Sequence, residues 1–309
     1  MFDEVVSNKR RSWVLTIGFA LFVALVAAAA IYLVGYGGPY VVIAAVVISI
    51  GSSVVAYWTS DKVALRVSRA RPASVEEFPQ LHNIVEGLCL AAGMPKPRLY
   101  VVDDPAPNAF ATGRNPEHAA VAATTGLLEK MNRDELEGVL AHELSHVRNY
   151  DILVSTLAVT MVGVVVVLAD LAVRMQWWGM GRNTHRDYDQ NRGGNDGGLG
   201  IIIAILGFLL LALAPLIAQL LQFAVGRRRE TLADVSGVEL TRYPQGLISA
   251  LEKLRDDSTV VHATTHATAH LWIEEPAAQT PAAGKISWIN RMFSTHPPID
   301  ERIALLRGM

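Results

Sequence analysis

The sequence has little cysteine, no excess of basic charge and no internal repeat. Its one cysteine, Cys89, excludes an intramolecular disulfide and is predicted to be a small buried side chain on a helix. A net charge of -2 and a pI of about 6.5 exclude the broad basic field typical of nucleic-acid binding, so nucleic acid is not an expected partner. The absence of a repeat of solenoid length excludes a repeat array.

Charge is also nearly absent from several long stretches. Hydrophobic residues make up 51% of the 309 residues and the mean hydropathy is +0.29, more than an ordinary soluble domain shows. The excess is concentrated in apolar runs at residues 14–34, 40–60, 152–173 and 199–225. Because about 20 apolar residues in a helix cross a bilayer, four transmembrane helices are predicted. The last two runs could instead form deep hairpins.

Basic residues flank these runs unevenly. One predicted side of the membrane carries ten of them: Lys9, Arg10, Arg11, Lys62, Arg66, Arg69, Arg71, Arg227, Arg228 and Arg229. The other side holds a short uncharged turn and the Gly-rich loop 175–199, which contains three arginines. Since cytoplasmic flanks are enriched in Lys and Arg, we expect a multi-pass plasma-membrane protein whose soluble domain and both termini are cytoplasmic. A cleaved signal peptide ending near residues 27–30 is disfavoured, because a second apolar run follows at once.

The remaining sequence predicts a mainly α-helical fold with a small β-sheet. A helix is expected at 75–92, strands at 98–103 and 118–125 with the second at an edge, and a turn-rich loop at 104–115. A further helix begins at Asn132, with Glu135 as its capping-box partner, and is predicted to continue into the third apolar run. The expected organisation is an N-terminal transmembrane hairpin (1–60), a first part of the soluble domain (61–151), a second transmembrane pair (152–225) and a second part of the domain (226–309).

Chemistry is concentrated in His142-Glu143-Leu144-Ser145-His146. Two histidines four residues apart project from one face of a helix, so both can bind a single tetrahedral zinc ion. The glutamate beside the first histidine is then within reach of the water that the metal activates, as a general base.

A catalytic zinc needs a third protein ligand, which could be a downstream His, Asp or Glu. Glu230 is the best candidate, because Glu230 and Asp234 are four residues apart on one helical face. One carboxylate could bind the metal while the other accepts a hydrogen bond from a ligand histidine. Alternatively, the two acids bind no metal and simply lie in the solvated first turns of a helix that begins with three arginines.

Four motifs in order resemble the HtpX family of membrane-integrated zinc metallopeptidases, which is related to the CAAX prenyl proteases. They are His-Glu-Leu-Ser-His, Arg-Glu-Thr-Leu-Ala-Asp, Asn-Ala-Phe-Ala-Thr-Gly and Ser-Thr-His-Pro-Pro. The resemblance implies a zincin-type domain that binds one Zn²⁺ through His142, His146 and Glu230. It also implies Glu143 as catalytic acid/base, Asp234 as the carboxylate behind a ligand, and His296 as an oxyanion stabiliser. The implied substrates are misfolded or damaged membrane proteins, cleaved at the cytoplasmic face of the lipid bilayer.

A peptide substrate is expected to lie extended along a strand edge, held by main-chain hydrogen bonds. The candidate contacts are Asn108, Ala109, Phe110, Ala111, Thr112, Ala120, Val121 and Ala122. Alternatively, these small residues pack a sheet beneath the helix. Two other functions stay open: a processing protease of narrow specificity, such as a CAAX protease, and a non-catalytic membrane scaffold that binds zinc. The sequence also allows another divalent metal.

Overall fold

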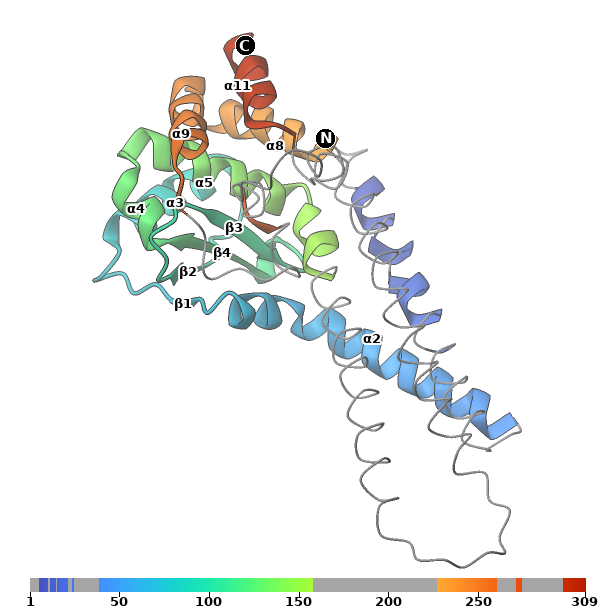
Figure 1. Cartoon of the computed structure of the whole chain (residues 1–309). Coiled ribbons are helices and arrows are strands. Elements are labelled where there is room, and N and C mark those ends of the chain that lie inside the picture. Colours follow the sequence, from blue (N-terminus) through green and yellow to red (C-terminus); the bar gives the residue numbers. More distant parts are fainter. Residues whose placement is uncertain are drawn as a thin grey trace, which may run out of the picture. The chain divides into compact units, whose positions relative to one another are not determined.

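The computed structural model describes residues 6–10, 12–14, 16–21, 24, 39–157, 227–259, 271–273 and 297–309 (Figure 1). The chain divides into two compact units. One comprises residues 1–12, 58–159 and 221–309, and the other comprises residues 13–57 and 160–220. Three separate stretches of sequence therefore build the first unit, which contains the sheet and the predicted zinc residues.

The described elements are mostly helices. They are α2 (Pro39–Val67), α3 (Pro79–Ala92), α4 (Thr125–Lys130), α5 (Arg133–Arg148), α8 (Arg227–Thr241), α9 (Pro244–Asp256) and α11 (Ile299–Arg307). The strands are β1 (Arg71–Pro72), β2 (Arg98–Val102), β3 (Ala109–Gly113) and β4 (Ala119–Thr124), with a 3₁₀ turn η1 (Pro116–His118) before β4. The predicted fold class, mainly helical with a small sheet, is confirmed.

The sheet has the order β1-β2-β4-β3. β2 and β4 are parallel, and β3 pairs with β4 in antiparallel fashion. β4 is therefore a central strand, and the prediction that it lies at an edge is wrong. The edge next to β4 is formed by β3, which falls within the stretch 104–115 that was predicted to be a loop.

The two faces of the sheet contact different parts of the chain. Because successive side chains alternate between faces, Leu99, Ala111 and Val121 join the larger hydrophobic core with α3, α5 and α9. Phe110 and Ala122 join a smaller cluster with Trp272 and the end of α2. Trp272 is fully buried and meets the Phe110 ring edge-on, with 4.7 Å between the ring centroids.

Local signals set both ends of α5. Asn132 and Glu135 form the predicted capping box, with hydrogen bonds of 3.0 and 2.8 Å between each side chain and the other residue's main-chain nitrogen. At the other end the chain leaves the helix at Asn149, and Tyr150 has a φ of 60°. The prediction of one continuous helix into the third apolar run is therefore wrong, because this left-handed residue interrupts it before the helical residues 151–157.

Glycines let two other helices approach α5 closely. A Cβ on Gly237 of α8 would lie 3.0 Å from the main-chain nitrogen of His142. A Cβ on Gly138 of α5 would lie 2.7 Å from the main-chain nitrogen of Leu247 in α9. Larger residues at either position would separate the helices, so Gly237 fixes the distance between α8 and α5, and Gly138 fixes the distance between α9 and α5.

Cys89 agrees with its sequence interpretation. It lies on α3, is 3% exposed, and burial raises the pKa of its thiol to about 11. A thiol with so high a pKa carries almost no thiolate near neutral pH and is therefore unreactive.

None of the helices in the described part of the chain combines the length and hydropathy that a membrane crossing needs. Of the four predicted spans, all of 199–225 and most of 14–34 and 152–173 lie outside the described residues, as does the predicted loop 175–199.

Candidate metal centre

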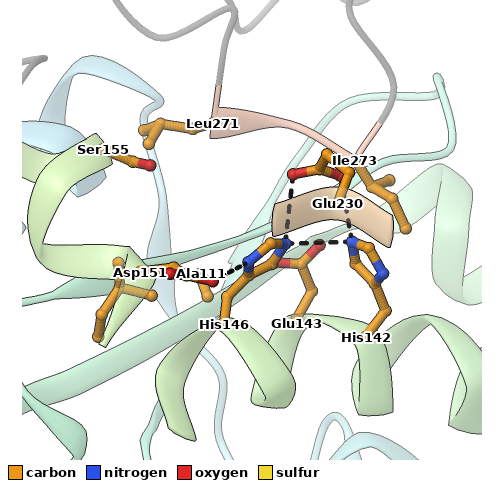
Figure 2. Close-up of a pocket in the computed structure, with 10 residues that line it drawn as sticks. Ala111, His142, Glu143, His146, Asp151, Ser155, Glu230, Leu271 and Ile273 are labelled. Carbon is orange, nitrogen blue, oxygen red and sulfur yellow. Dashed lines mark hydrogen bonds and ion pairs between the residues drawn. The ribbon is translucent and has the colours of Figure 1, made fainter. Parts of the chain in front are cut away.

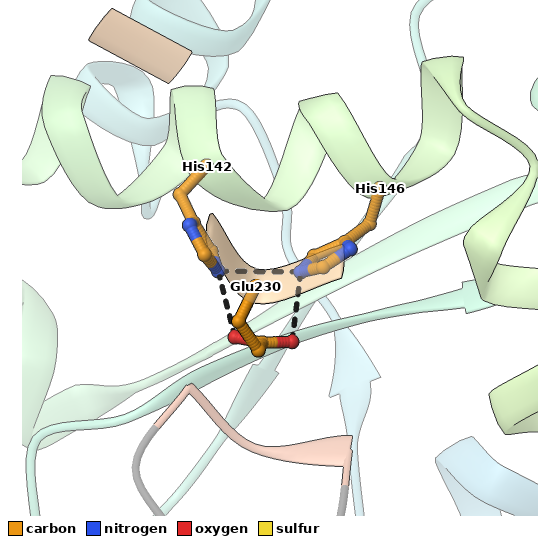
Figure 3. Close-up of side chains that lie close together, drawn as sticks. All are labelled: His142, His146 and Glu230. Atoms are coloured by element: carbon orange, nitrogen blue, oxygen red, sulfur yellow. Dashed lines mark hydrogen bonds and ion pairs between the residues drawn. The ribbon is translucent and has the colours of Figure 1, made fainter. Parts of the chain in front are cut away.

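Three predicted ligands meet at one point, although Glu230 is distant from the histidines in sequence. His142 and His146 lie one turn apart on α5, and Glu230 faces them from α8 (Figure 3). The two Nε2 atoms are 3.2 Å apart, and each lies 3.5 Å from an oxygen of Glu230. The ligand atoms of these residues all lie within 4.8 Å of one another.

These distances fit a tetrahedral zinc ion. Zinc binds histidine nitrogen and carboxylate oxygen at about 2.1 Å, so two ligands at the tetrahedral angle are about 3.4 Å apart. The three observed separations of 3.2, 3.5 and 3.5 Å bracket that value. A cation bound between these groups would also compensate the negative charge of Glu230, whose carboxylate is buried at 3% exposure.

A buried carboxylate orients the first histidine. Asp234 Oδ1 lies 2.9 Å from His142 Nδ1, which makes Nδ1 the donor and leaves Nε2 for the metal. Arg302 contacts the same carboxylate, with 2.7 Å between Nη2 and Oδ1 and 2.8 Å between Nε and Oδ2. Burial would raise the pKa of Asp234, but the Arg302 charge outweighs it and lowers this pKa to about 2. Asp234 is therefore a permanent anion behind the ligand.

A second carboxylate orients the other histidine. Asp151 Oδ2 lies 3.3 Å from His146 Nδ1, because the chain reversal at Tyr150 brings Asp151 back towards α5. The Asn8 side chain donates a hydrogen bond to the other oxygen of Asp151 and another, 3.0 Å long, to the main-chain oxygen of Asn149. The N-terminal segment thus contacts the group that holds a metal ligand.

The site opens into a small pocket that also contains Glu143 (Figure 2). Its lining is partly apolar, contributed by Ala111, Ile152, Leu271 and Ile273. Glu143 is 2% exposed and projects from α5 beside His142. A carboxylate that lies next to three metal ligands is positioned to exchange a proton with a reactant held there.

The predicted peptide contacts occupy different positions around the pocket. Ala111 lines it, whereas Asn108, Phe110 and Thr112 make internal contacts with Ala109, Trp272 and Thr156. Residues 120–122 cannot offer the open edge that was predicted for them, because β4 is paired on both sides.

Ala111 presents main-chain groups at the edge of the described sheet. The main-chain nitrogen of Thr124 donates to the oxygen of Asn108, so the alternation of an antiparallel pair directs the polar groups of Phe110 and Thr112 towards β4. Those of Ala109 and Ala111 point outward. The Ala109 oxygen accepts a hydrogen bond of 3.0 Å from the main-chain nitrogen of Ile273, while Ala111 faces the pocket.

Sequence reasoning missed two charged residues at the site, Asp151 and Arg302. Asp151 follows His146 by five residues beyond the helix end, and Arg302 follows the His-Pro-Pro motif, but neither spacing indicates a contact with a ligand. Conversely, His296 lies outside the described residues.

We expect zinc binding to strengthen as the pH rises. Burial alone would lower the pKa of His142, but the hydrogen bonds that its ring donates to the Asp234 and Glu230 carboxylates raise this pKa to about 9 in the absence of a metal. Zinc must displace this proton, so affinity should increase about tenfold per pH unit between pH 6 and 8. Competition with a chromophoric chelator at several pH values measures the slope. A flat profile would show that His142 binds no proton that zinc displaces.

Comparisons with known proteins agree with this geometry. The profile of peptidase family M48 matches residues 75–309. A protease HtpX homolog from Streptococcus gordonii is 43% identical over 100% of both chains. Another, from Caldanaerobacter subterraneus, is 40% identical over 100% of this chain and 98% of its own.

The crystal structure of S. mikatae Ste24p shares the fold. It superposes with a TM-score of 0.51 at 16% identity, over 99% of this chain and 67% of that one. At this identity the likeness supports the fold alone. The family match and the full-length relatives go further, and with the His142, His146 and Glu230 site they establish that the chain belongs to peptidase family M48, as an HtpX homolog and zinc metallopeptidase.

Proposed function

We propose that this metallopeptidase is an endopeptidase that cleaves misfolded or damaged membrane proteins at the cytoplasmic face of the membrane. The observation that carries the proposal is the position of Ala111, whose outward main-chain groups lie in the same pocket as Glu143 and the metal ligands. An extended polypeptide can pair with such an edge through its own main chain. This pairing would bring a peptide bond to the metal.

The residues of the pocket have distinct roles in hydrolysis. Zinc in a site of this kind supplies Lewis acidity, which polarises a carbonyl and makes water nucleophilic near neutral pH. Glu143 takes the proton from the attacking water and passes it to the departing amine nitrogen, which returns Glu143 to its carboxylate form. Asp234 and Asp151 keep both histidines in the ligating tautomer. His296 is assigned to the developing oxyanion on its His-Pro-Pro sequence alone.

Main-chain recognition favours quality control over narrow processing. Hydrogen bonds to a substrate backbone carry no side-chain preference, so unfolded segments of many sequences would bind. A scaffold role is disfavoured, because a structural zinc site is normally closed by a fourth protein ligand, whereas the described group supplies three and places Glu143 beside them.

The test is cleavage by the full-length protein, purified in detergent and loaded with zinc. We expect an unfolded protein to be cut at several internal sites, and the same protein to resist when folded. Cleavage of a prenylated C-terminal peptide alone would instead identify a narrow processing protease. A zinc-loaded protein that cuts neither substrate would support the scaffold.

Attachment to the lipid bilayer is part of the same proposal. The apolar side chains that α2 exposes support it: Tyr40, Ile43, Val46, Val47, Ile50, Val54, Val55 and Trp58. The four apolar runs of the sequence would anchor a peptidase domain made of residues 61–151 and 226–309. The basic flanks favour a cytoplasmic position for this domain and both termini.

Protease treatment of intact spheroplasts tests the orientation. An external protease should cut only within residues 175–199, where the loop between the last two apolar runs would be accessible. Cleavage near residues 100–120 without lysis would invert the proposed topology.

A further inference from the structure

Arg302 on α11 is a buried cation that the hydrolytic mechanism does not use. The residue is 2% exposed, and its guanidinium contacts Asp234, His142 and the main-chain oxygen of Ile273 at the metal site. We propose that Arg302 is a positioning residue, which holds His142 in the ligating orientation through Asp234 and fixes one wall of the pocket through Ile273.

The contact with Asp234 is bidentate. Two guanidinium nitrogens reach the two carboxylate oxygens at 2.7 and 2.8 Å, and Asp234 is fully buried. Oδ1 is shared, since it also lies 2.9 Å from Nδ1 of His142. Because the planar guanidinium donates to both oxygens, it prevents the carboxylate from rotating. A lysine ammonium, which acts as a single point charge, would restrain this rotation less. The orientation of the first metal ligand therefore depends on Arg302.

The third guanidinium nitrogen contacts the wall of the pocket. Nη1 donates to the main-chain oxygen of Ile273 at 3.2 Å, and the nitrogen of the same residue donates to Ala109 on the edge strand β3. Leu271 and Ile273 both line the pocket, opposite the ligands of α5 (Figure 2). Arg302 thus contacts both the carboxylate that orients His142 and the segment 271–273, which pairs with β3 at Ala109, two residues before Ala111.

A purely structural role would leave the metal affinity unchanged, and the chain supplies controls for it. Arg307 lies on the same helix and pairs at 2.5 Å with Glu252 at the surface. Lys253 pairs at 2.7 Å with Glu135, a buried carboxylate at the opposite end of α5. Arg307→Met tests the loss of an arginine from α11. Lys253→Met tests the loss of a cation from a buried acid.

Zinc affinity is the decisive measurement, and it needs no peptide cleavage. Each variant is made in full-length Glu143→Gln protein, which cannot use the proposed base, and zinc is titrated against a chromophoric chelator. We expect Arg302→Met to weaken zinc binding about 10–100-fold. Arg302→Lys should fall between this variant and the parent, because it keeps the charge and loses the fork. Arg307→Met and Lys253→Met should bind as the parent does.

Equal affinities for the parent and both Arg302 variants, each folded by thermal melting, would overturn the proposal. If Arg302→Met does not fold, Arg302→Lys decides alone. The second part of the proposal, that Arg302 fixes a wall of the pocket through Ile273, rests on the proposed function. It is tested separately by measuring cleavage of an unfolded substrate by Arg302→Lys with Glu143 intact and zinc at saturation. A raised KM at an unchanged kcat would support the role of Arg302 in holding Ile273. An unchanged KM would overturn that role and leave the conclusion from zinc affinity intact.

Discussion

Replacing Glu143 with glutamine is expected to reduce kcat by about 10²–10⁴-fold, the usual contribution of a general acid–base group. This corresponds to about 3–5 kcal/mol of lost transition-state stabilisation. The amide has nearly the same size as the carboxylate, so it should fit the buried position beside His142 without displacing the helix. It cannot accept a proton from water. Zinc content should stay at one ion per chain, because Glu143 is not among the three ligands.

Glu137→Gln is the matched control. It makes the same chemical change on the same helix, six residues earlier and outside the residues that line the pocket. Its cleavage rate should equal that of the parent. Both rates are measured on one unfolded substrate, with zinc content determined on the same samples. If Glu143→Gln retains zinc and cleaves at the parental rate, Glu143 is not the base.

Features with local causes could be predicted from the sequence. The Asn132–Glu135 capping box is set by residues three apart, and Gly93 ends α3 in the left-handed conformation that glycine adopts readily. The spacing of His142 and His146 fixes their common face on any α-helix. These features need no information about the rest of the chain.

Features that depend on contacts between distant parts of the sequence could not be predicted from it. Apart from Phe110, β3 consists of small residues after a stretch with two prolines, and it becomes a strand only because it pairs with β4. The strand order that places β3 rather than β4 at the edge is equally non-local.

The same limit applies to the charged residues around the site. Asp151 reaches His146 through a left-handed residue at Tyr150, a bulky side chain for which that backbone conformation is unusual. Arg302 reaches Asp234 across 68 positions of sequence, so only the packing of α11 reveals it. Glu230 could be anticipated, because it lies four residues before Asp234 on one helical face and because its motif resembles that of a known family.

Replacing Glu230 with alanine should produce the largest loss of metal. The two histidines alone leave zinc without its third protein ligand and without the one anionic ligand of the set. Loss of a ligand's outer partner costs about 10–100-fold in affinity, and we expect loss of the ligand itself to cost more than about 100-fold. Cleavage should fall in proportion to the zinc lost and return partly when zinc is added in excess.

Thermal melting separates this effect from unfolding. A ligand that binds only the folded state raises its melting temperature, so excess zinc should stabilise the parent strongly and raise the melting temperature of Glu230→Ala much less. Glu239→Ala removes an exposed acid from the same helix and should respond to zinc as the parent does. One zinc ion retained per chain in Glu230→Ala, with a parental melting shift, would mean that another group completes the site. Glu230 would then not be a metal ligand, and its 3.5 Å contacts with the two histidines would serve only to hold α8 against α5.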